Sequence, residues 1–315
     1  MQGLSKGAKI AVETCMGVRP REIVLVVTDP ARLRIAEALV EAAEKARAEA
    51  MLMCMQARSR HGEEPPKPVE RAMMASDVVL APTTYSLTHT QARLRACRAG
   101  ARVVTMPMIT EEMMCRGAML ADYREVSRLT HKVADLLTKA SEVEVSTSAG
   151  TDLVLDISGR EACPDTGIFH NPGDFGNLPA GEAFIAPIEG KAKGRIVVDG
   201  SMVDTLWATI EIKVNSGRAT RISGRPANRL IKMLEEAGPK AYNLAEFGIG
   251  TNPKARLIGN VLEDEKVLGT CHVAFGDNST FGGRVRAGIH VDGILLKPTI
   301  KLDGKIIMEK GQLEI

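Results

Sequence analysis

The residues best suited to chemistry in this chain are His290 and Asp292, which flank Val291 near the C-terminus. Side chains two apart in a β-strand point to the same face. A strand here would therefore present an imidazole and a carboxylate side by side and turn Val291 toward a core. His272, in the apolar run 269–275, offers a second imidazole. Two histidines and one aspartate are enough for a catalytic divalent metal with open positions.

Two glutamates stand where a carboxylate is unusual. Glu182 follows a Pro-Ala-Gly turn and leads into an apolar segment, and Glu246 lies among apolar residues and glycines. A buried carboxylate without a partner is costly. Metal coordination offsets that cost, and so does a salt bridge to an arginine or exposure at a sheet edge. The two residues by themselves leave these alternatives open.

His89 is a third kind of candidate. It follows an expected strand at 77–81, at the carboxyl end of a parallel sheet, where ligands usually bind. We expect it to act as a general acid or as a substrate contact that reaches across the domain cleft. The alternative is a histidine at a helix start that caps locally with Thr88 and Thr90.

The first half of the chain alternates short apolar strands with helices. Strands are expected at 22–28, 50–55, 77–81 and 101–105, with helices at 31–47, 69–75 and 88–99. This order is typical of a doubly wound, mostly parallel, Rossmann-like sheet. The turn after the first strand lacks the glycines of a dinucleotide site, and no G-x-G-x-x-G motif occurs, so no nucleotide cofactor is expected.

The second half has a different pattern. After a long helix at 122–140, strands are expected at 142–146, 152–157, 194–198, 207–213 and 218–222, a helix at 226–237, and a meander over 288–308. Gly-rich turns between these strands indicate a mixed, largely antiparallel β domain with a few helices. We therefore predict two domains, a Rossmann-like α/β domain at 1–140 and a metal-binding α+β domain at 141–315.

Composition excludes several classes of function. The 315 residues carry 41 basic and 39 acidic side chains, and only 3% are aromatic. This balance gives no electrostatic case for nucleic acid and few rings on which bases could stack. The six cysteines include no C-x-x-C pair, and no apolar run is long enough for a membrane span. A cytoplasmic protein with reduced cysteines is expected.

Four segments of the second half resemble the aminopeptidase T family of metallopeptidases. They are 177–184, 245–253, 269–278 and 289–292, in the family's order. The resemblance implies a homodimer with a two-metal site of zinc, cobalt or manganese that removes N-terminal residues from peptides. The ligands that it implies are Glu182, Glu246, His272, His290 and Asp292. It makes Glu246 the bridge between the ions, and Glu182, Glu246 and His89 are the expected catalytic residues.

The chain also departs from the peptidase pattern. It is shorter, the interval from His272 to His290 is trimmed, and a tyrosine expected soon after His272 is missing, since none follows Tyr242. A related branch of the superfamily resembles 2,5-dihydroxypyridine 5,6-dioxygenase and holds one Fe(II) in a facial triad, for which His272, His290 and Asp292 suffice. A ring-cleaving dioxygenase and a metal-binding homologue without activity are therefore the alternatives to the peptidase.

Overall fold

The computed structural model describes residues 2–203, 205–207 and 209–315, and it divides into two compact units. The first unit comprises Met1–Ser127 and Thr166–Ala180, and the second comprises Arg128–Asp165 and Gly181–Ile315. The division at residue 140 that the sequence predicts treats each domain as one continuous stretch. In the structure, the segment 166–180 returns to the first unit because it adds a strand to that unit's sheet.

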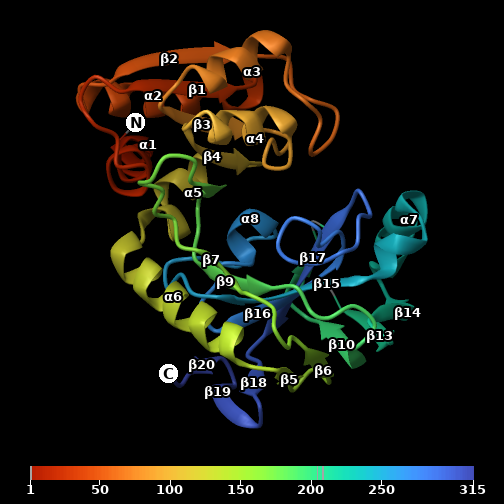
Figure 1. Ribbon diagram of the computed structural model, residues 1–315. Helices are drawn as coiled ribbons and strands as arrows, with labels where there is room; N and C mark the ends of the chain where they lie inside the picture. Colours follow the sequence, from red (N-terminus) through yellow and green to blue (C-terminus); the bar gives the residue numbers. More distant parts are fainter. Residues whose placement is uncertain (1, 204, 208) are drawn as a thin grey trace. The chain divides into compact units, whose positions relative to one another are not determined.

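The first unit is built on a five-stranded parallel sheet in the order β2-β1-β3-β4-β8, of which Figure 1 labels β1 to β4. Its strands are β1 (Ile23–Thr28), β2 (Glu49–Cys54), β3 (Val78–Thr83), β4 (Arg102–Pro107) and β8 (Phe175–Asn177). Its helical segments are α1 (Gln2–Lys9), η1 (Ile10–Cys15), η2 (Pro30–Arg32), α2 (Leu33–Lys45), α3 (Lys67–Met74), α4 (Gln91–Arg98), α5 (Glu111–Cys115) and η3 (Gly117–Leu120). The parallel sheet with intervening helices that the sequence predicts is confirmed.

Local sequence sets where the helix α4 begins. Thr90 has extended backbone, and its side chain accepts a hydrogen bond from the backbone N–H of Arg93, so it is the N-cap. The helix therefore starts at Gln91, three residues later than the expected start at 88. His89 consequently lies in the exposed turn before the helix.

A partly buried ion pair joins the first unit's sheet to the loop before β1. The Arg102 guanidinium donates to both carboxylate oxygens of Glu22, at 3.0 and 2.8 Å, and the backbone N–H of Arg19 donates to the same carboxylate at 2.8 Å. Burial opposes ionisation of Glu22, but these hydrogen bonds outweigh it and lower the pKa of the carboxyl from its ordinary 4.5. The folded protein therefore binds the Glu22 proton more weakly than the unfolded chain does.

This linkage predicts how Glu22 affects stability at different pH values. Because the folded-state pKa is lowered, the stabilisation is present above the ordinary pKa of 4.5 and is lost as pH falls through the folded value. We expect Glu22→Gln to lower the free energy of unfolding by about 1.5–3 kcal/mol at pH 7, the usual contribution of hydrogen bonds to charged groups, and by less in acid. Urea unfolding at pH 7 and pH 3 measures both.

The exposed helix pair of Glu41 and Lys45 supplies the control. Both side chains are about 60% exposed, so Glu41→Gln should change the unfolding free energy by no more than about 0.5 kcal/mol. An equal effect of the Glu22 and Glu41 variants at pH 7 would contradict the assignment.

The second unit contains two sheets that are antiparallel throughout. The eight-stranded sheet consists of β5 (Glu142–Ser146), β6 (Asp152–Asp156), β10 (Lys193–Val198), β13 (Ile210–Asn215), β14 (Arg218–Gly224), β18 (Thr299–Leu302), β19 (Lys305–Glu309) and β20 (Gln312–Leu313). The seven-stranded sheet consists of β7 (Cys163–Asp165), β9 (Glu182–Ile185), β11 (Ser201–Met202), β12 (Thr205–Leu206), β15 (Leu244–Gly250), β16 (Thr270–Gly276) and β17 (His290–Leu296). The helical segments are α7 (Ala227–Ala237), η4 (Pro239–Tyr242) and α8 (Val261–Asp264), and α6 (Tyr123–Lys139) runs from the first unit into this one.

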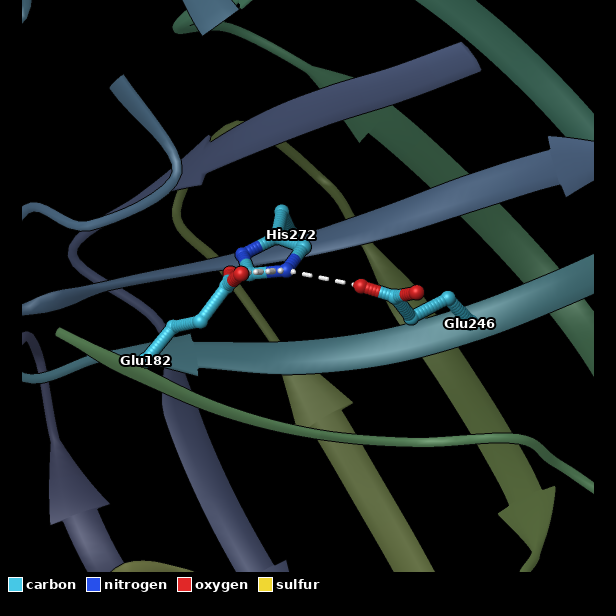
Figure 2. Close-up of side chains that lie close together, drawn as sticks. All are labelled: Glu182, Glu246 and His272. Carbon is cyan, nitrogen blue, oxygen red and sulfur yellow. Dashed lines mark hydrogen bonds and ion pairs between the residues drawn. The ribbon is translucent and has the colours of Figure 1, made fainter. Parts of the chain in front are cut away.

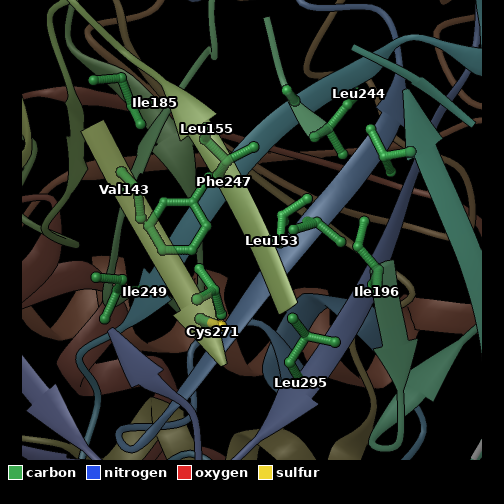
Figure 3. Packing of buried hydrophobic residues seen from close by; sticks show 14 of the residues in the cluster. Val143, Leu153, Leu155, Ile185, Ile196, Leu244, Phe247, Ile249, Cys271 and Leu295 are labelled. Carbon is green, nitrogen blue, oxygen red and sulfur yellow. The ribbon is translucent and has the colours of Figure 1, made fainter. Parts of the chain in front are cut away.

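The two sheets of this unit share one apolar core (Figure 3). Every second residue of the central strands of the seven-stranded sheet enters it, for example Phe247, Ile249, Cys271 and Leu295. Because side chains alternate between faces, the intervening residues of these strands point to the opposite face. The same alternation that builds the core therefore leaves one face of β9, β15, β16 and β17 for polar groups.

Among the described residues, no helix is both long enough and apolar enough to cross a bilayer.

Candidate metal centre

Strand register brings the predicted carboxylate ligands to one face of the seven-stranded sheet. Glu182 of β9 lies opposite Gly250 of β15, and Glu246 of β15 lies opposite Ala274 of β16. Ala274 in turn lies opposite Asp292 of β17. Paired residues of an antiparallel sheet point to the same side. The three carboxylates therefore share the face that points away from the apolar core.

Both histidines lie on this face opposite glycines. His272 pairs with Gly248, and His290 pairs with Gly276. A Cβ added at Gly248 would lie only 2.1 Å from Nε2 of His272, so the imidazole occupies the volume that a side chain at 248 would fill. The glycine thus makes room for the ring to lie across β15 toward the carboxylates.

A β-bulge turns Glu246 toward the site. Leu244 pairs with Phe275 and packs in the apolar core, yet Glu246 pairs with Ala274, so the register shifts by one residue at Ala245. Without this shift, residues 244 and 246 would point to the same face. The bulge lets the chain bury Leu244 in the core and aim Glu246 at the opposite face, as bulges near functional sites commonly do.

The first group of donors consists of Glu182, Glu246 and His272 (Figure 2). The Nε2 atom of His272 lies 3.0 Å from Oε2 of Glu182 and 3.2 Å from Oε1 of Glu246. All three side chains are buried, with the imidazole fully excluded from solvent. One nitrogen and two carboxylate oxygens thus face a common point in the interior.

The second group consists of Glu246, His290 and Asp292. The Nε2 atom of His290 lies 3.4 Å from Oε2 of Glu246 and 3.4 Å from Oδ1 of Asp292. The other ring nitrogen, Nδ1, lies 2.9 Å from the backbone oxygen of Asp277, which orients the ring so that Nε2 faces the carboxylates. Glu246 is common to both groups and offers a different oxygen to each.

Two carboxylate oxygens in these groups fit a bound cation. Among the described residues, Oε2 of Glu182 and Oδ1 of Asp292 are buried and receive no well-aligned hydrogen bond, and each faces an imidazole Nε2, that of His272 at 3.0 Å and that of His290 at 3.4 Å. Leaving a buried carboxylate oxygen unpartnered is costly, and a divalent ion would satisfy Glu182 and Asp292. Imidazole nitrogens with carboxylate oxygens suit zinc, cobalt, manganese and iron. The residues present therefore fit the divalent metal that the sequence predicts.

The electrostatics of the centre favour a cation. Burial opposes ionisation of Glu246, but hydrogen bonds from His272 and His290 prevail and lower its pKa to about 2. Burial likewise opposes charge on the two imidazoles, but the adjacent carboxylates raise both histidine pKa values well above the ordinary one. A metal ion would compete with protons for these imidazoles, since a histidine must be neutral to coordinate.

A buried lysine completes the cluster, and it was not predicted from the sequence. Lys266 is 1% exposed, and its Nζ lies 2.5 Å from Oε1 of Glu182, 2.6 Å from Oε1 of Glu265 and 3.4 Å from Oδ2 of Asp165. Burial and the Glu182 charge raise the pKa of Glu265 to about 8. The run 263–266 is entirely charged, a composition typical of exposed surface, so it gave no signal.

The sequence matches a known protein family over nearly its whole length. The model of 2,5-dihydroxypyridine 5,6-dioxygenase matches residues 8–315. The chain belongs to the 2,5-dihydroxypyridine 5,6-dioxygenase family. The resemblance to the superfamily that contains this branch is thereby confirmed, and the protein is a member of an enzyme family.

The fold of this chain is similar to two solved structures, a 2,5-dihydroxypyridine dioxygenase and an aminopeptidase T. The dioxygenase from Pseudomonas putida KT2440 is 21% identical, with a TM-score of 0.83 over 99% of this chain and 96% of its own. AmpT from Thermus thermophilus is 16% identical, with a TM-score of 0.74 over 100% of this chain and 99% of its own. No curated protein matches the sequence significantly.

One predicted site residue, His89, belongs to a different unit from the other five. His89 belongs to the first unit, on the exposed turn before α4, whereas the five metal-ligand candidates belong to the second unit. Its role as a general acid or substrate contact stays a prediction.

Proposed function

We propose that this protein is a two-metal hydrolase that removes N-terminal residues from peptides. The observation that carries the proposal is the position of Glu246, which offers one oxygen to each of two donor groups. A carboxylate shared in this way is suited to bridging two ions, and two adjacent ions can activate a water molecule and polarise a peptide carbonyl.

The two ends of the centre differ in their exposure to solvent. Glu182 and His272 form the closed end, because the His272 side chain is 0% exposed. His290 and Asp292 form the open end, because their side chains are 29% and 12% exposed. A substrate therefore reaches the centre from the His290 side. Under this proposal Glu182 and His272 would hold an ion and would not touch the substrate.

Two aromatic rings flank the open end. The rings of Phe184 and Phe281 meet edge to face at 5.4 Å, and Phe281 meets the His290 ring at 5.9 Å. Phe184 lies opposite Gly248, on the ligand face of the sheet. Such rings help to fix the His290 imidazole and shield its open side from water.

A ring-cleaving dioxygenase that uses one Fe(II) ion is the second candidate. The family match over residues 8–315 and the lack of a tyrosine after Tyr242 favour it. It would use His272, His290 and Asp292 as a facial triad. Among the residues that the structure describes, the donor groups within 4.8 Å are instead the two that share Glu246, which is why we place the hydrolase first.

Metal content per chain, measured after purification without added metal, separates the two candidates. The hydrolase should carry two ions, and Glu182→Gln should reduce them to one and abolish peptide hydrolysis. Glu235→Gln, on the exposed surface of α7, is the matched control and should leave both values unchanged. One ion per chain in wild type and Glu182→Gln alike, with Fe(II)-dependent oxygen uptake on 2,5-dihydroxypyridine, would establish the dioxygenase instead.

A further inference from the structure

We propose that Lys266 is a positioning residue that holds Glu182 as a one-oxygen metal ligand. The inference rests on the proposed two-metal centre and adds a residue to it. It starts from the two oxygens of Glu182, which have different surroundings. Oε1 accepts a hydrogen bond from Nζ of Lys266 at 2.5 Å, whereas Oε2 is buried, receives no well-aligned hydrogen bond from the described residues and lies 3.0 Å from Nε2 of His272.

This asymmetry determines how Glu182 can bind an ion. A carboxylate with both oxygens free can coordinate through either or both of them. Here the Lys266 ammonium occupies Oε1, so only Oε2 remains to point at the position shared with His272 and Glu246. Groups that hydrogen-bond to a metal ligand orient it in this way, and their loss typically costs 10–100-fold in metal affinity.

The lysine is itself held in place. Besides Glu182, its ammonium contacts Glu265 at 2.6 Å and Asp165 at 3.4 Å. Asp165 pairs with Glu182 across β7 and β9, so the acceptors approach Nζ from two neighbouring strands and from residue 265 of its own chain segment. Contacts from several directions fix the ammonium beside Oε1.

A lysine suits this position better than an arginine. The ammonium is a compact point charge that can satisfy one oxygen, whereas a guanidinium is a planar fork that tends to take both oxygens of a carboxylate. At position 266 a fork would compete with the metal for Oε2 of Glu182. An arginine at position 266 would therefore keep the positive charge but would not leave Oε2 of Glu182 free to bind the metal.

The test compares metal binding by Lys266→Met, Lys266→Arg and wild type, with Zn²⁺ as the probe in equilibrium dialysis. The ion at Glu182 should bind about 10–100-fold more weakly in both variants, so that content falls from two ions to one at a concentration that saturates the wild type. The ion at Glu246, His290 and Asp292 should remain. Lys301→Met removes a partly exposed lysine of the same unit, which pairs with Glu144, and should keep both ions.

The outcomes separate this inference from the proposed function. Two ions of wild-type affinity in Lys266→Met, or full rescue by Lys266→Arg, would overturn the positioning role and leave the two-metal hydrolase standing. A single ion in the wild type would overturn both.

A second measurement needs no substitution at the buried lysine, whose variants can fail to fold. A crystal structure of the Zn²⁺-loaded wild type should show Glu182 bound to the ion through Oε2 alone, with Nζ of Lys266 still on Oε1. Coordination through both oxygens, or a lysine that has left Glu182, would refute the inference.

Discussion

Glu246→Gln should empty both metal positions at once and abolish activity. Glutamine keeps the volume of the side chain but replaces the shared carboxylate with a neutral amide, which offers one weak oxygen donor instead of two charged ones. Because His272 and His290 each lie beside a different oxygen of Glu246, both donor groups lose a ligand. We expect metal content to fall from two ions to nearly none. Activity should fall by more than the roughly 10²–10³-fold that loss of one charge-stabilising group costs.

Variants that change a ligand of only one donor group provide the comparison for metal content. Asp292→Asn touches only the second group and should remove one ion, as Glu182→Gln should for the first. Glu211→Gln changes an exposed residue of β13 in the other sheet, is matched in chemistry and should keep both ions. If Glu246→Gln lost no more metal than Asp292→Asn, Glu246 would not be a bridge.

Much of the fold was predictable because its signals are local. The apolar runs at 22–28 and 77–81 have the composition of strands that are buried on both faces, and they form β1 and β3 of the parallel sheet. The spacing of His290 and Asp292 also predicted a shared face, since that property depends only on the alternation within one strand. The structure places both residues in β17 with Val291 in the core.

The rest of the site depends on contacts between distant segments. Whether Glu182 approaches His272 is decided by the register of β9, β15 and β16, and neither residue carries that information alone. The bulge at Ala245, which turns Glu246 to the ligand face, has no clear signature in the sequence. The residues themselves therefore left both glutamates open, and only the resemblance to a family joined them to the histidines.

The return of 166–180 to the first unit is non-local for the same reason. Its strand β8 spans only three residues, Phe175–Asn177, which is too short for a recognisable alternation. It pairs with β4, about 70 residues earlier in the chain, through contacts such as that of Val103 with Phe175. A division of the chain by composition cannot detect such a pairing, because loop closure over this distance leaves no local pattern.

Gly248→Ala should disable the first donor group while the fold persists. The new Cβ would lie 2.1 Å from Nε2 and 2.3 Å from Cε1 of His272, so the imidazole must move away from Glu182 and Glu246. Gly248 lies in β15 without a positive φ, so alanine is compatible with its backbone. We expect one ion to be lost and hydrolysis to fall at least about 10²-fold, because misplacing a catalytic group by about 1 Å has that effect. Metal content and peptide hydrolysis measure the two consequences.

Gly293→Ala is the matched control, on the opposite face of the same sheet. Its Cβ would lie 2.9 Å from Cγ2 of Val198 and 3.2 Å from Sδ of Met202, both in the apolar core. Overpacking of a core costs typically about 1–3 kcal/mol, so this variant should lose thermal stability but keep both ions. Gly248→Ala should show the reverse, with a smaller loss of Tm and a missing ion. If both variants lost stability equally and both kept their metal, Gly248 would serve packing alone and His272 would not depend on the room that it leaves.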